Sequence, residues 1–166
     1  MLEAVVFYTL AATLLVFGLL VITRTNPIAS ALSMVGAFGT LAALYAILSA
    51  TLLAIIQILV YAGGIMVLVI FVIMLLNLHA ADLKKIEADR LSVGLNLGIA
   101  LGCVAAPVGL VLAMGSWAPA PLPPGFGDIF SVGEKLFADY LFPFEILSLL
   151  LLAAVVGALV LAKRKL

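Results

Sequence analysis

Apolar residues in this chain gather in long uninterrupted runs, and polar residues fall in the shorter stretches between them. Five runs reach about 20 residues, the length that an α-helix needs to cross a bilayer. They do not alternate apolar and polar positions as membrane β-strands do, so they predict helices. The predicted spans are residues 2–22, 28–48, 51–78, 91–114 and 143–162. The pattern predicts an all-α integral membrane protein with a single membrane domain, residues 1–166.

Composition agrees with this pattern. Hydrophobic residues make up 67% of the chain and charged residues 10%, against about 45–50% and about 25% in soluble domains.

The N-terminal stretch MLEAVVFYTL has no positively charged segment before its apolar run. We therefore expect the first helix to be retained and not cleaved as a signal peptide. The expected location is the cell inner (plasma) membrane, as a multi-pass protein.

Basic residues predict the orientation of the five spans. One group of seven follows spans one, three and five: Arg24, Lys84, Lys85, Arg90, Lys163, Arg164 and Lys165. Lys135 alone falls on the opposite side. Because basic residues concentrate in cytoplasmic loops, the N-terminus is expected outside and the C-terminus in the cytoplasm.

The outer loop, residues 115–142, combines two kinds of sequence. Its first part, APAPLPPGFGD, is rich in Pro and Gly and predicts irregular structure. In the following SVGEKLFADYLF, apolar residues recur at helical spacing: Val132, Leu136, Phe137, Tyr140 and Leu141. This spacing predicts a short amphipathic helix that lies at the membrane interface.

The scarcity of Cys and His limits the chemistry of the chain. Cys103 and His79 are the only residues of their types. A disulfide within the chain would need two cysteines, and a haem held between two histidines would need two histidines, so the chain alone can form neither. Iron–sulfur clusters generally need four thiolates. We expect no catalytic residues, no metal or cofactor site and no nucleic-acid partner. If the protein serves a redox system, the redox centres are expected in other chains.

The third span contains Tyr61-Ala62-Gly63-Gly64 near its middle. Gly disfavours a helix by about 1 kcal/mol relative to Ala, so two adjacent glycines need a reason. One reading is close packing against neighbouring helices. The other is a kink or a π-bulge, a local widening that often marks functional sites. Gln57 precedes Tyr61 by four residues, so both are expected on one face, where they could hydrogen-bond a partner helix or water.

Small residues also mark the fourth span. Gly94, Gly98 and Gly102 are four residues apart, and Ala106 continues the series. Such a stripe lets membrane helices approach closely, which predicts a packing surface. Pro107 lacks a backbone N–H and is expected to bend the helix.

Glu145 is the only carboxylate embedded in a run of membrane-spanning length. Pro143 suits the first position of a helix, which would put Glu145 in the first turn, where a carboxylate complements the helix dipole. Intramembrane acids also serve function, so proton handling or a polar contact to a partner subunit is the alternative.

Three segments resemble one known family. LLAIIQILVYAGGIMVLVIFVIMLLN, RTNPIASALSMV and GEKLFADYLFPFEILSLLLLAAVVGALVLAKR are similar to segments of the subunit J (chain 6) family of proton-pumping NADH:quinone oxidoreductase, respiratory complex I. The resemblance covers most of the chain and implies the same five-span topology with the N-terminus outside. It also implies that the chain couples quinone reduction to proton translocation as a membrane-arm subunit.

The resemblance further implies a π-bulge in the third span around Tyr61, Gly63 and Gly64. In that family the helix can rotate into a regular α-helix, and a water path forms or breaks beside it. Bulky neighbours such as Met66 and Phe71 would then rotate between two packings. Some members carry Glu at the position of Gln57, and Gln cannot take up a proton.

The expected partners are lipid and the quinone-site and antiporter-like subunits of the membrane arm. NADH, FMN, iron–sulfur clusters and quinone are expected in other subunits of the complex. Two alternatives remain at this stage. The chain could be a purely structural packing subunit, or a small stand-alone secondary transporter, although a transporter generally carries more polar residues at mid-membrane.

Overall fold

The computed structural model describes residues 2–24, 26–76, 98 and 121–163. All regular structure in these residues is helical, and four of the helices are long and apolar enough to cross a membrane. The prediction of an all-helical membrane protein is confirmed to that extent. Apart from Gly98, the fourth predicted span lies outside the described residues. The chain divides into two compact units, one ending at Leu122 and the other beginning at Pro123.

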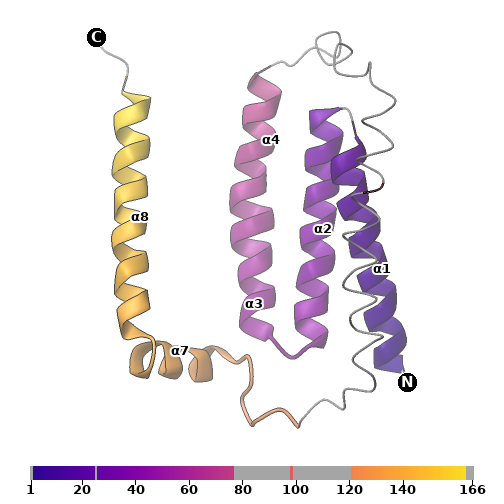
Figure 1. The fold of residues 1–166 in the computed structure, drawn as a ribbon, viewed down its shortest axis with the longest axis vertical. Coiled ribbons are helices and arrows are strands. Elements are labelled where there is room, and N and C mark those ends of the chain that lie inside the picture. The colour runs from indigo at the N-terminus through magenta and orange to yellow at the C-terminus, as the bar shows by residue number, and fades with distance from the viewer. Residues whose placement is uncertain (1, 25, 77–97, 99–120, 164–166) are drawn as a thin grey trace. The chain divides into compact units, whose positions relative to one another are not determined.

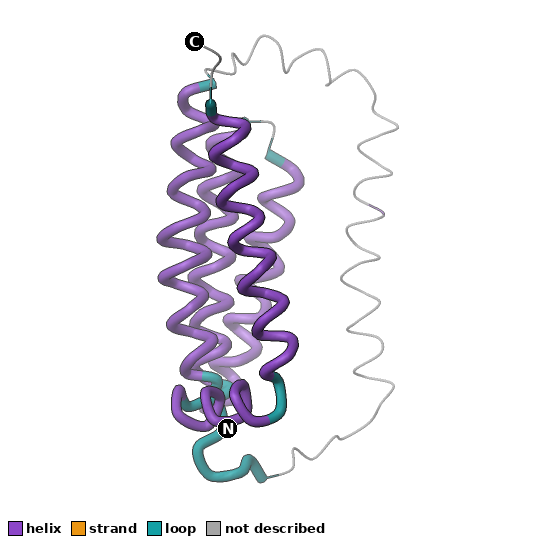
Figure 2. Tube along the Cα trace, turned by 90° about the vertical axis from the view of Figure 1, so that its left-hand side faces the viewer, coloured by secondary structure: helices purple, strands orange, loops and turns teal. Residues whose placement is uncertain are grey.

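The first unit is a row of three membrane-length helices. They are α1 (Leu2–Thr23), α2 (Pro27–Ile47) and a third helix made of α3 (Thr51–Ile56), η1 (Gln57–Ile65) and α4 (Met66–Leu75). Figures 1 and 2 show them side by side, with the direction of the chain alternating from each to the next. Because α2 contacts both α1 and all three parts of the third helix, it forms the centre of this unit.

The start of α2 follows from two adjacent residues. The Asn26 side-chain oxygen accepts hydrogen bonds from the backbone N–H groups of Ile28, at 2.9 Å, and Ala29, at 3.4 Å. Pro27 takes the first helical position, where its missing N–H costs no hydrogen bond. Asn26 and Pro27 together therefore determine where α2 begins.

A tight turn joins α2 to the third helix. The N–H of Ala50 donates to the carbonyl of Tyr45, at 2.9 Å, and the N–H of Ser49 donates to that of Ala46, at 3.1 Å. These two bonds form the Schellman motif, whose residue after the cap is left-handed and is usually Gly. Here that residue is Ser49, with φ 59°.

Close contact between α1 and α2 depends on a missing side chain. A Cβ placed on Gly36 would lie 2.6 Å from Cε1 of Phe17, far inside van der Waals distance. Near the turn between the same helices, the Ser30 hydroxyl donates to the carbonyl of Val21 at 2.6 Å. Shape and one polar contact therefore fix how these two helices meet.

Most of the other described Ser and Thr hydroxyls bond within their own helix. Each donates to a backbone carbonyl three or four residues earlier: Thr9, Thr13, Thr23, Ser33, Thr40 and Ser148. In lipid these bonds replace the water that would satisfy a hydroxyl at a protein surface.

The second unit is a short helix followed by a long one. The first, α7 (Ile129–Ala138), falls where the amphipathic helix was predicted. The second, α8 (Leu141–Ala162), begins two residues before the predicted span. Pro143 is therefore the third residue of α8 and Glu145 the fifth, so the prediction that Glu145 lies in the first turn was wrong. The first four N–H groups of any helix lack intrahelical acceptors, which lets Pro143 occupy the third position without loss.

Candidate functional site: a π-helical segment in the third helix

The third helix changes its winding partway along. Residues Gln57–Ile65 form the π-helix η1, nine residues long, which continues from α3 and into α4 without a break. At its far end the N–H of Met66 donates to the carbonyl of Tyr61, five residues earlier, instead of the i−4 acceptor of an α-helix. π-Helices of this kind are rare and concentrate at functional sites. The glycines of the YAGG motif lie inside this segment.

Gly63 and Gly64 have different surroundings. A Cβ on Gly63 would lie 3.1 Å from the carbonyl oxygen of Ile58, whereas a Cβ on Gly64 would lie 3.7 Å from that of Leu59. Both oxygens belong to residues five positions earlier, the spacing of π-helical hydrogen bonds. The first distance is too short for an unforced contact and the second is an ordinary one. The π-winding therefore favours Gly at position 63 and tolerates a side chain at position 64.

One side chain of this segment and one directly after it are buried. Gln57, at the start of η1, is 6% exposed, and Met66, directly after it, is 1% exposed. Their neighbours on the helix are mostly exposed. Gln57 and Met66 therefore mark the inner face of the third helix.

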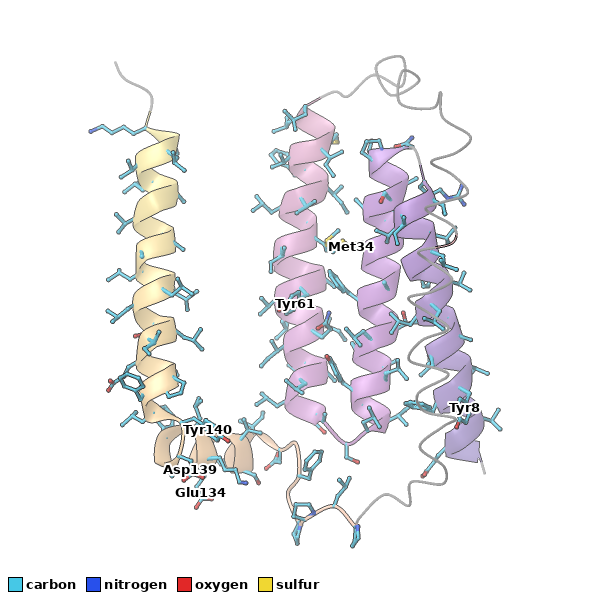
Figure 3. The ribbon with its side chains drawn as sticks, viewed as in Figure 1. Tyr8, Met34, Tyr61, Glu134, Asp139 and Tyr140 are labelled. Carbon is cyan, nitrogen blue, oxygen red and sulfur yellow. The ribbon has the colours of Figure 1, made fainter. Side chains whose placement is uncertain are left out.

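Tyr61 lies at the edge of this inner face. Its ring packs edge-on against Phe38 of α2, with the ring centroids 5.6 Å apart. The side chain is still 45% exposed, so its surroundings differ from those of Gln57, with which it was expected to share a face. In Figure 3, Tyr61 lies on the third helix and Met34 extends from α2 towards α4.

The predicted residues are brought together only in part. Gln57, Tyr61, Gly63 and Gly64 lie within η1, and Met66 follows it directly. Phe71 lies in α4 and is 51% exposed, away from the buried positions. Glu145 is an exposed residue of α8, in the second unit.

The predicted packing stripe is largely beyond the described part of the chain. Gly94, Gly102 and Pro107 lie outside the described residues, and Gly98 is described without its neighbours. Helix packing by this stripe stays a prediction.

Phe38 is the site residue that the sequence analysis missed. Its stretch of α2, GAFGTLAA, carries small residues on both sides of one large ring. That contrast is the signal that could have singled it out, because small neighbours let another helix approach the ring.

No charged residue lies within η1, and the described residues contain no group of three His, Cys, Asp or Glu side chains that could hold a metal ion. The polar groups of the segment are the Gln57 amide and the Tyr61 hydroxyl. Both can exchange hydrogen bonds with water. The arrangement suits a conformational or water-binding role.

Comparison with known proteins identifies the family. The family described as NADH-ubiquinone/plastoquinone oxidoreductase chain 6 matches residues 17–161. The chain belongs to this family. The matched region includes the whole third helix and nearly all of α8.

Individual members of the chain 6 family cover almost the whole chain. It is 35% identical over 99% of its length to the NAD(P)H-quinone oxidoreductase subunit 6 of the organellar chromatophore of Paulinella chromatophora, and covers 80% of that protein. It is 36% identical over 98% of its length to NAD(P)H-quinone oxidoreductase chain 6 of a Nostoc species, again covering 80%. The NADH-quinone oxidoreductase subunit J of Rhodobacter capsulatus is 31% identical over 95% of this chain, with 80% of that protein covered. The predicted family is thereby confirmed.

Proposed function

We propose that this chain is a membrane-arm subunit of an NAD(P)H-quinone oxidoreductase and that its third helix switches between two windings. In this proposal the switch couples quinone reduction to proton translocation. Family membership supports the first statement, since the relatives are named as subunits of such enzymes. The second statement rests on the geometry of η1.

The burial of Gln57 and Met66 carries the proposal. They are nine residues apart, which in an α-helix of 3.6 residues per turn is two and a half turns and puts them on opposite faces. In a helix with i→i+5 bonds, nine residues make about two turns, which returns the second residue to the face of the first. Both are buried here, at 6% and 1% exposure. Conversion of η1 to α-helix would rotate one of these two side chains by about half a turn, from the buried face of the helix to the exposed face.

Such a rotation is a discrete change and not a gradual bend. The two windings bury different sets of side chains against α2, which gives a bistable element of the kind that transmits conformational change. Tyr61 would move relative to Phe38, and Phe71 would rotate with α4. Water held by the Gln57 amide or the Tyr61 hydroxyl would be displaced or gained in the same step. The Gln57 side chain would orient water without taking up a proton itself.

The same proposal assigns location and partners. The chain would cross the cell inner membrane five times with its N-terminus outside, next to the quinone-site and antiporter-like subunits. NADH, FMN, iron–sulfur clusters and quinone would be bound by other subunits. Glu145, exposed in the second turn of α8, would contact a partner subunit or take part in proton transfer.

A pair of glycine variants tests the switch. Gly63→Val adds a branched side chain where even a Cβ lies 3.1 Å from the Ile58 carbonyl, and Gly64→Ala is the matched control at 3.7 Å. In assembled complex, we expect Gly63→Val to lower quinone reductase and proton-pumping activity together, by about tenfold or more, a change in barrier of about 1.4 kcal/mol. NADH–ferricyanide activity should stay near that of the unmodified enzyme. Normal pumping by assembled Gly63→Val complex would contradict the switch.

A purely structural subunit is the second candidate. The contact of Gly36 with Phe17 and the bond from Ser30 to Val21 favour it, because they show helices fitted to each other closely. A packing subunit fails by losing assembly, whereas a switch fails with assembly intact. Purification by a C-terminal tag, with the co-purifying subunits identified by mass spectrometry, separates the two. A chain that purifies alone would instead favour the stand-alone transporter.

A further inference from the structure

We propose that α7 lies in the headgroup region of the bilayer that α8 crosses, with its apolar side against the lipid acyl chains. The partner is the lipid surface itself. This interaction has no part in the helix switch and stands independently of it.

The connection between the two helices places α7 at a membrane surface. Only Asp139 and Tyr140 separate them, and both backbone N–H groups donate to the carbonyl of Lys135, at 2.9 and 3.2 Å. The N–H of Phe144 then donates to the carbonyl of Tyr140 at 3.1 Å, which begins α8. With 22 residues, α8 is about 33 Å long at 1.5 Å per residue, which matches a hydrocarbon core of about 30 Å. Its first turn therefore lies at one surface, and α7 lies there with it.

The sequence of α7 divides it into two sides. At 3.6 residues per turn, one arc holds all of its large apolar residues. They are Ile129, Phe130, Val132, Leu136 and Phe137. The opposite arc holds Ser131, Glu134 and Lys135.

Contacts with α8 show which way these sides face. Phe137 packs edge-on against Phe144 of α8, with the ring centroids 5.3 Å apart. Figure 1 shows α7 lying across the direction of α8, and in Figure 3 Glu134 points away from α8. The apolar side is therefore turned towards the region that α8 crosses, and the charged side is turned away from it.

Exposure and charge indicate lipid as the occupant of the apolar side. No residue of α7 is buried, and Phe130 is 85% exposed. Together with its flanking residues, α7 carries three acidic groups and one basic group: Asp128, Glu134, Asp139 and Lys135. The net charge of −2 (one minus three) disfavours attraction to anionic headgroups, so apolar burial must drive the interaction. Tyr140, at the corner, is of a type enriched at headgroup level.

Spin labels on the full chain in nanodiscs of phosphatidylcholine test this arrangement. In a Cys103→Ala background, a label is attached to Phe130→Cys and, as the matched control, to Glu134→Cys. Collision with oxygen, which concentrates in lipid, is compared with collision with a water-soluble nickel chelate. We expect the ratio of oxygen to nickel accessibility to be at least threefold higher at position 130. If the Phe130→Cys variant does not reconstitute into nanodiscs, the label on the apolar side is attached to Ile129→Cys instead.

Three results would overturn the proposal. Equal access of the nickel chelate to positions 130 and 134 would place α7 in water. Exclusion of both reagents from position 130 would mean that protein, such as a second copy of the chain, covers the apolar side. If the label at position 130 enters the lipid only after anionic lipid is added, the argument from charge is wrong.

Discussion

The ring of Tyr61, in the π-helical segment, meets the ring of Phe38 on α2 at an interplanar angle of 66° and a centroid distance of 5.6 Å. Among the described residues, this is the aromatic pair that joins η1 to another helix. A half-turn of η1 cannot keep this geometry. The contact is therefore a local reporter of the winding, as well as a source of stability for it.

A double-mutant cycle on this pair should give a measurable coupling energy. Edge-to-face aromatic pairs contribute about 0.5–1.5 kcal/mol beyond their area burial. We expect Tyr61→Leu and Phe38→Leu each to lower the free energy of unfolding, with an interaction term in that range when they are combined. Tyr61→Phe keeps the ring and should retain the coupling. Steric trapping in detergent or bicelles measures these energies, and strict additivity of the two Leu variants would show that the pair contributes nothing.

Burial of Met66 predicts a large effect of truncation. Met66→Ala removes a side chain that is 1% exposed, and such cavities cost about 2–5 kcal/mol. Phe71→Ala removes a larger side chain that is 51% exposed, and should cost less than about 1 kcal/mol in the isolated chain. Unfolding free energies of the two purified variants give the comparison. The ranking would be reversed if the third helix were α-helical throughout and turned Met66 outward.

The contact between α1 and α2 predicts that adding a methyl group has very different effects at two glycines of α2. Gly36→Ala would place a methyl group 2.6 Å from Phe17, whereas the surroundings of Gly39 leave room for a Cβ. Overpacking of this kind costs about 1–3 kcal/mol. We expect Gly36→Ala to lower the amount of subunit recovered in assembled complex, with Gly39→Ala close to the unmodified protein. The second change Phe17→Leu should restore part of the loss, and no restoration would place the cause outside this contact.

The left-handed backbone of Ser49 predicts that a substitution at this position stabilises the protein. Its φ of 59° is left-handed, a conformation that costs a residue with a Cβ about 1–2 kcal/mol. Ser49→Gly should therefore raise the unfolding free energy, by about 0.5–1 kcal/mol once the added freedom of the unfolded chain is subtracted. Thermal unfolding in detergent is a sufficient measurement. A lower midpoint would indicate that the Ser49 side chain has a favourable contact that outweighs its backbone strain.

Local sequence signals could predict the start of a helix where the capping residues themselves determine it. Asn26 and Pro27 form a cap whose hydrogen bonds involve only the next few residues, so α2 could be predicted closely. The same reasoning misplaced the start of α8, because Pro143 is as acceptable at the third position as at the first. Glu145 was assigned to the first turn for that reason alone.

Winding and packing needed information beyond local sequence. The motif around Gly63 and Gly64 was compatible with either close packing or a bulge, and only the distance from Gly63 to the Ile58 carbonyl distinguishes the two glycines. The choice of Phe38 as the partner of Tyr61 depends on how α2 is aligned against the third helix. That alignment follows from the turn at Ser49 and from the extra residues per turn in η1, which together fix which residues meet.

The hydroxyl groups that bond within their own helices bear on how the protein is made. A helix whose Thr and Ser side chains already have acceptors carries little unpaired polarity into lipid. Each helix can then enter the bilayer as a finished unit during synthesis, without waiting for its neighbours. Ser30 differs, because its acceptor belongs to Val21 of the preceding helix. We therefore expect α1 and α2 to be released from the insertion machinery as a hairpin, ahead of the rest of the chain.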